Sequence, residues 1–389
     1  MDLTALLARA VDLGASDIHL KLGRPPVLRR DGELHPLDEA PSLTEDDLAS
    51  VLDTVAGAAP ERLRAFRDTG ELDLAFEPPG LPRFRVNAYR QRGATSLAFR
   101  VIPRVVPTFS QLGLPPGVER LAAEQRGLVL VTGATGSGKT TTLAAMIDHI
   151  NRTRRAHIIT IEDPIEIVHA DRGCIVSQRE VGIDTASFGE ALRRALRQDP
   201  DVILIGELRD AETAQTALHA AESGHLVLST MHTLDAAETC ERLIAFFPHG
   251  KQELVRSIAA GVLRGVVSQR LLPRIGGGRV PAVEVMVTNA RIADLIREGR
   301  AAEIGDAIAE GEFFQMQTFA QALIDLVLEG KVEHEVAANA ATNRHDFLVA
   351  LEQALKRRAA EEAAARADAA AAAVQPAATP TGLRVASGT

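Results

Sequence analysis

The sequence predicts an α/β protein with two domains, and three observations support this prediction. Between residues 128 and 230, short apolar segments alternate with helical segments, which is typical of a largely parallel, doubly wound sheet. Roughly the first hundred residues instead contain short strands, hairpin turns and a few helical segments, as in a small α+β domain. Prolines at positions 103, 107, 115 and 116 separate the two patterns and indicate a linker.

Length and composition agree with this interpretation. A chain of 389 residues has room for roughly two or three domains, and 46% hydrophobic and 24% charged residues are ordinary for a globular protein. The formal net charge is -9, Trp is absent and Tyr occurs once. Binding to nucleic acid draws on surplus Lys and Arg and on aromatic stacking, so we expect no nucleic-acid partner, although a locally basic channel is compatible with the sequence.

The cysteine content and the lack of long apolar runs indicate in which cellular compartment the protein is expected. The two cysteines, Cys174 and Cys240, are too few for a four-thiolate zinc site, and a reduced, cytoplasmic protein is the simplest expectation. The N-terminus has no basic segment before a long apolar stretch, and no apolar run approaches the roughly 18 residues of a spanning helix. We therefore expect any membrane association to go through a partner.

Residues 1–104 are predicted to form the small α+β domain, followed by the linker at 105–116. Helical patterns cover 3–13 and 42–67, strand patterns cover 18–22, 27–30, 72–76, 84–89 and 95–102, and Asp31-Gly32 indicates a hairpin turn.

Residues 117–358 are predicted to form the second domain, and 359–389 an Ala-rich helix that frays into a disordered tail. Strands are expected at 128–132, 157–161, 202–205 and 226–230, and a helix at 139–151. Residues 250–356 are expected to be mostly helical, with a loop at the three glycines 276–278.

The strongest chemical signal is a complete G-x-x-x-x-G-K-[ST] motif between a predicted strand and a predicted helix. It consists of Gly133, Ala134, Thr135, Gly136, Ser137, Gly138, Lys139 and Thr140, and Thr141 follows it. The glycines allow backbone N–H groups to converge on phosphate oxygens at a helix N-terminus. Lys139 is expected to bind the β- and γ-phosphates of ATP, and the Thr140 hydroxyl to bind Mg²⁺.

Carboxylates follow two of the other predicted strands. The strand at 202–205 ends in Gly206-Glu207, and the strand at 157–161 is followed by Glu162, Asp163 and, three residues on, Glu166. Ligands of a parallel sheet bind at the carboxyl ends of its strands, so these acids are predicted to face the phosphate loop. There they are predicted to act on the attacking water or on Mg²⁺.

Two histidines lie at the two ends of the strand at 226–230. His225 precedes it and is expected to be merely hydrogen-bonded, whereas His232 falls at the end that faces the phosphates. His232 is therefore a candidate sensor of the γ-phosphate.

Taken together, these segments resemble the type II/type IV secretion ATPase superfamily, and within it the pilus-retraction branch. The order of the phosphate loop, Ile-Glu-Asp-Pro-Ile-Glu, Gly-Glu-Leu-Arg-Asp and Gly-His-Leu-Val-(x)3-Met-His-Thr is similar to its Walker A, Asp box, Walker B and His box. Residues 15–20 and 83–87 resemble its N-terminal domain, and residues 290–298 its C-terminal Ala-Ile-Arg-Asn-Leu-Ile-Arg-Glu signature. The resemblance spans about residues 1–355.

The resemblance implies a PAS-like N-terminal domain and a RecA-like ATPase domain in a hexameric ring. It implies Glu207 as the main catalytic carboxylate, with Glu162 and His232 assisting. It further implies that a neighbouring subunit supplies arginines to the phosphates, and the matching positions are Arg85, Arg92 and Arg100. A cation delivered to a transferring phosphoryl group stabilises its spreading negative charge.

The implied function is an ATP-hydrolysing motor that powers pilus retraction at the cytoplasmic face of the inner membrane. An inner-membrane platform protein, and a paralogous pilus ATPase, are the implied partners. The C-terminal signature reads Ile292-Ala293-Asp294 where the family has Ile-Arg-Asn, which puts its coupling role in doubt, and its apolar face also fits plain core packing. Extension ATPases typically carry an additional N-terminal domain and a tetracysteine zinc site, and neither is expected here.

Three alternatives stay open at this point. An accessory regulator that assembles with another ATPase is predicted to turn over slowly alone, and a pilus-extension or type II secretion ATPase would share the same motifs. A RecA-like nucleic-acid translocase also shares the phosphate loop, but the acidic charge balance and the shortage of Tyr and Trp weigh against it.

Overall fold

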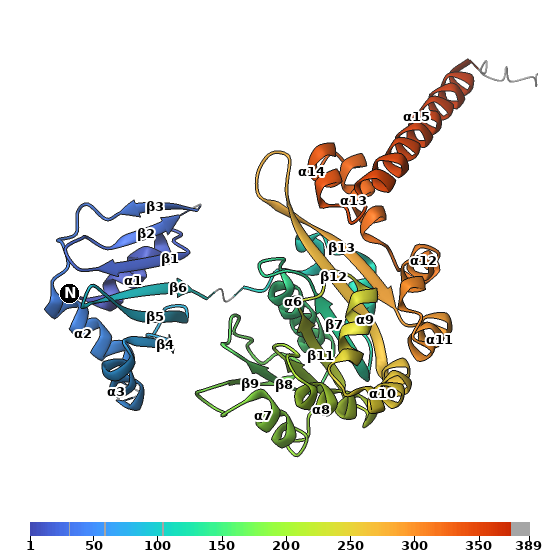
Figure 1. Ribbon diagram of the computed structural model, residues 1–389. Helices are drawn as coiled ribbons and strands as arrows, with labels where there is room; N and C mark the ends of the chain where they lie inside the picture. Colours follow the sequence, from blue (N-terminus) through green and yellow to red (C-terminus); the bar gives the residue numbers. More distant parts are fainter. Residues whose placement is uncertain (31, 58–59, 103–104, 375–389) are drawn as a thin grey trace, which may run out of the picture.

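The computed structural model describes residues 1–30, 32–57, 60–102 and 105–374, and it contains two separate β-sheets (Figure 1). Each sheet has its own hydrophobic core, and the chain passes from the first to the second between β6 and α4. Mixed α/β architecture is therefore confirmed.

The first sheet has six strands in the order β3-β2-β1-β6-β5-β4, and each recorded neighbour pair is antiparallel. Its strands are β1 (Asp17–Lys21), β2 (Val27–Arg30), β3 (Glu33–Pro36), β4 (Glu71–Phe76), β5 (Phe84–Gln91) and β6 (Ala94–Val101). Phe84 and Phe99 meet edge to face in its core, with ring centroids 6.4 Å apart. The predicted turn residue Asp31 lies outside the described residues.

Three helices pack on this sheet: α1 (Leu3–Asp12), α2 (Glu45–Ala56) and α3 (Pro60–Thr69). Thr44 and Asp47 form a reciprocal capping box at the start of α2, which satisfies backbone donors there. The single helical segment predicted at 42–67 is thus two helices, α2 and α3, in the structure.

The second sheet has seven strands in the order β13-β12-β7-β11-β10-β8-β9. They are β7 (Gly127–Thr132), β8 (His157–Glu162), β9 (Ile175–Glu180), β10 (Val202–Ile205), β11 (Leu226–Met231), β12 (Leu263–Pro273) and β13 (Arg279–Val287). Strands β7 to β12 pair in parallel, and β13 is antiparallel to β12. Every residue of β7, β10 and β11 is buried, as expected for strands covered on both faces.

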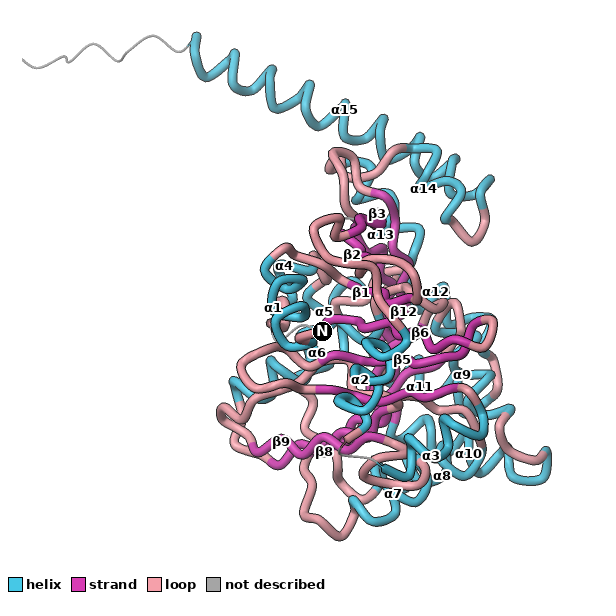
Figure 2. The backbone as a smooth tube through the Cα atoms, turned by 90° about the vertical axis from the view of Figure 1, so that its left-hand side faces the viewer, coloured by secondary structure: helices cyan, strands magenta, loops and turns pink. Residues whose placement is uncertain are grey.

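Helices cover both faces of this sheet, as Figure 2 shows from the side. They are α5 (Pro116–Ala122), α6 (Lys139–Thr153), α7 (Phe188–Ala195), α8 (Ala211–Glu222), α9 (Ala236–Ala245), α10 (His249–Val262), α11 (Ala290–Glu298) and α12 (Ile304–Ala309), with short 3-10 turns η1 (Ala301–Glu303) and η2 (Glu312–Phe314). On α11, Ile292, Leu295 and Ile296 are buried in the main core, so the apolar face of the C-terminal signature does pack.

The segment predicted as a linker carries the short helix α4 (Phe109–Leu112). Phe109 and Leu112 pack with Val106 against Ala144 and Ala145 of α6, so this segment lies on the second sheet's helices.

The expectation of a mostly helical region at 250–356 is wrong for β12 and β13. These two long strands form a hairpin, and the three glycines 276–278 close it in left-handed backbone conformations. The apolar runs of β12 and β13 are buried on both faces over much of their length, so they lack the alternation that marks a half-exposed strand. The edge strand β9 is also absent from the sequence prediction, because Ser177, Gln178 and Arg179 make it polar.

The last three helices are α13 (Phe319–Leu328), α14 (His334–Ala340) and α15 (Arg344–Val374). They form a separate apolar cluster on the hairpin, against Leu272, Val280 and Ala282. Helix α15 then projects away from the body of the molecule (Figure 1). Residues 375–389 lie outside the described residues, so the predicted disorder of the tail stays a prediction. In the part of the chain that the structure describes, no helix is long and apolar enough to cross a membrane.

Candidate active site

A cavity of about 540 Å³ lies at the carboxyl ends of the parallel strands β7, β8, β10 and β11. Its wall includes residues of the phosphate loop, His232 and the four predicted acids Glu162, Asp163, Glu166 and Glu207, from four separate segments of the chain. Parallel strands bring their carboxyl ends to one edge of the sheet, so residues far apart in sequence converge there.

The phosphate loop joins β7 to α6, as its motif predicts. Gly133, Gly136 and Gly138 all have positive φ, at 138°, 80° and 94°. A Cβ at Gly133 would also lie 2.4 Å from the Gln269 carbonyl oxygen and 2.6 Å from Ser137 Oγ. A side chain at position 133 is thus excluded by both backbone conformation and space.

Of the nine residues predicted to bind nucleotide, six line the cavity: Thr135, Gly136, Gly138, Lys139, Thr140 and Thr141. The other three, Gly133, Ala134 and Ser137, shape the loop behind this wall. Ser137 is buried, and its backbone N–H donates to the Ala134 carbonyl at 3.2 Å, which closes the turn.

Lys139 opens α6 and is only 9% exposed. Its Nζ donates to the carbonyl oxygens of Gly133 at 2.7 Å and Ala134 at 2.9 Å, so the ammonium group is held over the loop. Burial lowers the pKa of Lys139, and the nearby Glu166 carboxylate opposes that shift. A phosphate group in the loop would supply the anionic partner that this cation lacks.

Glu162 ends β8 and is buried, with 9% exposure. Its Oε1 accepts hydrogen bonds from Thr160 Oγ1 at 2.6 Å and Gln178 Nε2 at 3.0 Å. Burial raises the pKa of Glu162, and these two donors partly offset the rise. A carboxyl group in this environment holds a proton more readily than a solvated one.

Glu207 follows β10 and contacts two basic side chains. His232 Nε2 lies 3.1 Å from Glu207 Oε2, and Arg209 forms an ion pair with Oε1. Thr230 Oγ1 donates to the Gly206 carbonyl at 2.7 Å, which fixes the turn that presents Glu207. Burial, then the positive charges of Lys139 and Arg209, lower the pKa of His232, which favours the neutral imidazole.

The donor set fits a magnesium ion held mainly by phosphate and water. Thr140 lines the cavity beside the loop, and its hydroxyl is the protein oxygen expected on the ion. Among the described residues, no cluster of three or more His, Cys, Asp or Glu side chains could hold a metal ion by itself. Mg²⁺ typically binds through one or two protein oxygens plus substrate phosphates, so this arrangement suits it.

The three predicted arginines have different positions. Arg100 on β6 lines the cavity of its own chain and pairs with Asp17, with Nε 2.8 Å from Oδ1. Arg85 is on the neighbouring strand β5, lies outside the cavity wall and is 4.0 Å from Asp73. Arg92 lies in the turn between β5 and β6 with a φ of 53°, and it too is outside the wall. Of these three predicted arginines, only Arg100 lines the cavity within one chain.

Several lining residues escaped the sequence analysis. Leu271 and Arg279 come from the β12–β13 hairpin, and the helical prediction for that region hid them. Arg209 is part of the quoted Gly-Glu-Leu-Arg-Asp motif, but nothing in the motif indicates that it pairs with Glu207. The other histidine considered in the sequence analysis, His225, is at the opposite end of β11 and contacts the Ala220 carbonyl at 3.0 Å, as expected.

The fold and the cavity define a P-loop nucleotide-binding protein, and comparison with known proteins makes this more specific. Residues 2–279 match the family described as "Type II/IV secretion system protein". The chain therefore belongs to the type II/IV secretion system protein family.

Similar proteins and structures cover most of the chain. It is 46% identical to the type IV pilus retraction ATPase PilT of Pseudomonas aeruginosa, over 89% of this chain and all of that one. It is 40% identical to the type IV pilus ATPase PilU of the same organism, over 89% of this chain and 90% of that one. The crystal structure of the pilus retraction motor PilT with bound ADP matches with a TM-score of 0.84 and 45% identity, covering 89% of this chain and 98% of that chain.

Proposed function

We propose that this protein is an ATP-hydrolysing motor that powers type IV pilus retraction. The observation that carries the proposal is the single cavity in which the phosphate loop faces Glu207, Glu162 and His232. The similarity to PilT, over nearly the whole of both chains, supports the ATPase activity and the retraction role.

The chain's own residues divide the chemistry among them. Lys139 and the loop N–H groups bind the phosphates, and Thr140 would hold a Mg²⁺ ion, which would neutralise charge on the β- and γ-phosphates. Glu207 orients the attacking water, and His232 fixes the position of the Glu207 carboxylate. Arg100 adds a positive charge to the cavity wall, where the transferring phosphoryl group gains negative charge.

The architecture that accompanies this function has four parts. Residues 1–104 form a PAS-like domain, 105–116 a connecting segment, 117–358 a RecA-like ATPase domain and 359–389 a tail. The antiparallel sheet with its three helices, and the separate cores of the two sheets, support this division. The subunits assemble as a homohexamer that acts peripherally at the cytoplasmic face of the inner membrane, through an inner-membrane platform protein.

Two measurements test the proposal. Steady-state Mg-ATP hydrolysis should rise per subunit with protein concentration as the ring assembles, and Lys139→Ala should abolish nucleotide binding while Lys251→Ala, at an exposed lysine on α10, should not. In a piliated strain that lacks its own retraction ATPase, the parent gene should restore twitching motility and Lys139→Ala should not. Hydrolysis without any rescue of twitching would contradict retraction.

A second candidate is an accessory ATPase of the PilU kind, which the 40% identity to PilU supports. In that case the isolated chain would bind ATP and hydrolyse it slowly at every protein concentration, until a paralogous pilus ATPase is added.

A pilus-extension ATPase would instead restore piliation in a strain that makes no pili. The acidic charge balance supports the absence of a nucleic-acid partner, and salt-independent failure to bind DNA tests it.

A further inference from the structure

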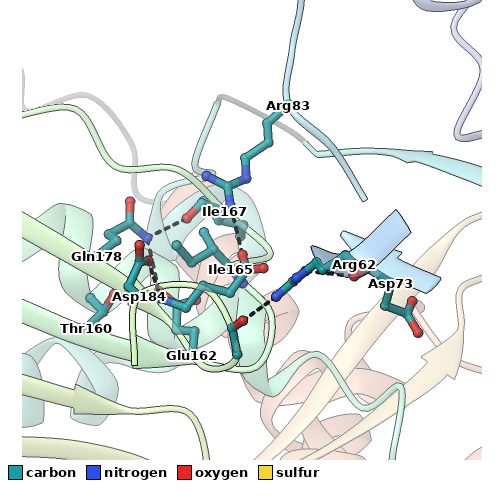
Figure 3. Close-up of polar contacts among 11 residues, drawn as sticks. Arg62, Asp73, Arg83, Thr160, Glu162, Ile165, Ile167, Gln178 and Asp184 are labelled. Carbon is teal, nitrogen blue, oxygen red and sulfur yellow. Dashed lines mark hydrogen bonds and ion pairs between the residues drawn. The ribbon is translucent and has the colours of Figure 1, made fainter. Parts of the chain in front are cut away.

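A partly buried ion pair links the antiparallel sheet to the ATPase sheet. Arg83, immediately before β5, donates from a terminal guanidinium nitrogen to Glu180 Oε2 at 2.8 Å (Figure 3). The side chain of Arg83 is 20% exposed and that of Glu180 is 5% exposed. Glu180 is almost fully out of water, so loss of Arg83 would leave its carboxylate buried without this cationic partner.

The same Glu180 oxygen also holds the loop that follows Glu162. Oε2 accepts a hydrogen bond from the backbone N–H of Ile165 at 3.3 Å. Glu180 ends β9, directly beside Glu162 at the end of β8, and Val181 N–H donates to the Glu162 carbonyl at 2.8 Å. One carboxylate atom therefore joins Arg83 to the backbone between Glu162 and Glu166.

A second side chain on the same face of β9 holds the other end of this loop. Gln178 lies two residues before Glu180, so their side chains point to the same side of the strand. The Gln178 amide donates to Glu162 Oε1 at 3.0 Å and to the Ile167 carbonyl at 2.9 Å. Strand β9 thus fixes both the Glu162 carboxylate and the loop after it.

Arg83 is also hydrogen-bonded to the chain directly after β6, the strand that carries Arg100. Its carbonyl accepts from Ile102 N–H at 2.8 Å, and Arg85 is paired with Arg100 in the register of β5 and β6. Arg62 of α3 adds a neighbouring contact, because its guanidinium donates to the Gly182 carbonyl and, at 2.8 Å, to the Asp73 carbonyl (Figure 3). A shift of the first sheet therefore moves Arg83 and Arg100 together.

We propose that Arg83 and Glu180 are positioning residues that couple the placement of the N-terminal sheet to the Glu162 loop and so set the rate of hydrolysis. Neither residue lines the cavity, so both act through the Ile165 backbone and through Arg100. This inference rests on the proposed ATPase function. When the pair forms, the catalytic loop and Arg100 are held in place together, and when it breaks, both lose that constraint.

The first test does not depend on hydrolysis. Hydrogen–deuterium exchange of the peptide that contains residues 163–167, measured without nucleotide, should be at least about tenfold faster in Arg83→Gln and Glu180→Gln than in the parent. Arg9→Gln is the matched control, because Arg9 forms an exposed ion pair with Glu39 in the same sheet's helical layer. Unchanged exchange in both variants would overturn the proposal even if the chain proves not to hydrolyse ATP.

The second test is a double-mutant cycle on Mg-ATP turnover. Each single variant should lower kcat about tenfold, the double variant should lower it no further, and the Kd for ATP should change less than twofold. Arg83→Lys keeps the positive charge and should recover part of the lost kcat. It is the second variant to measure if Arg83→Gln does not fold. Additive losses, or a weaker Kd with unchanged kcat, would contradict a positioning role, whereas an inactive parent would contradict the proposed function alone.

Discussion

His232 Nε2 lies 3.1 Å from Glu207 Oε2, although 25 positions separate the two residues. They meet because β10 and β11 are parallel neighbours, with Ile205 paired to Ser229, so the residues after each strand emerge side by side. Glu207 also pairs with Arg209, which gives this carboxylate two basic partners.

Replacing Glu207 by Gln should separate binding from turnover. The amide keeps the size of the side chain but removes the charge that orients water, so we expect ATP to bind as in the parent and kcat to fall about 100-fold or more. A fluorescent ATP analogue and a phosphate-release assay measure the two quantities. Glu222→Gln, at an exposed position on α8, is the control, and full activity of Glu207→Gln would remove Glu207 from its role.

Subunit mixing should distinguish Arg100 from Arg85. Arg100 lines the cavity of its own chain, so the defect of Arg100→Ala, about 100-fold in kcat, should persist when that protein is mixed with Lys139→Ala subunits. Arg85 lies outside that wall, and if it serves a neighbour's site, as proposed for these arginines, the defect of Arg85→Ala should be partly rescued by the same mixture. Rescue of Arg100→Ala would place Arg100 at a shared site instead.

Two glycines of the phosphate loop should respond differently to alanine. Gly133→Ala meets the Gln269 carbonyl at 2.4 Å as well as an unfavourable φ, so we expect loss of nucleotide binding and a lower unfolding temperature. Gly136→Ala has no heavy atom within 4 Å of the new Cβ and carries only the backbone cost, of about 1 kcal/mol. Thermal unfolding of both variants tests this, and equal effects would contradict it.

The buried Glu284 on β13 should make stability depend on pH. Burial raises the pKa of Glu284 from 4.5 to about 7, although it accepts a hydrogen bond from Ala236 N–H at 2.9 Å and lies near Arg270. The folded state then binds this proton more tightly than the unfolded state, so the contribution of Glu284 to stability is present below about pH 4.5 and is lost as the pH rises to about 7.

Glu284→Gln removes this titration and keeps an acceptor for Ala236. Its free energy of unfolding relative to the parent should therefore rise by roughly 3 kcal/mol between pH 4.5 and pH 8, as measured by urea titration. A constant difference between the two proteins over this range would show that folding does not raise the pKa of Glu284.

The phosphate loop and the strands that flank it could be predicted from the sequence because their signals are local. Gly133 to Thr140 combine a fixed spacing with a fully apolar strand before and a helix after, and the structure has that order. Arg279 could not be predicted to reach the cavity, because its position depends on the pairing of β12 with β7 and β13, which no local pattern specifies. The contact between Arg83 and Glu180 likewise joins residues 97 positions apart.

The C-terminal helices cover apolar side chains of the ATPase sheet itself. Leu272, Val280 and Ala282 on the β12–β13 hairpin are buried in a cluster with residues of α13, α14 and α15, and Arg270 stacks on Phe319 with its guanidinium carbon 4.3 Å from the ring centroid. A protein truncated before Phe319 would keep every residue that lines the nucleotide cavity. It would, however, expose the apolar side chains of the β12–β13 hairpin to solvent. Such a truncation is expected to aggregate, so the last helices cannot be trimmed away to yield a minimal ATPase.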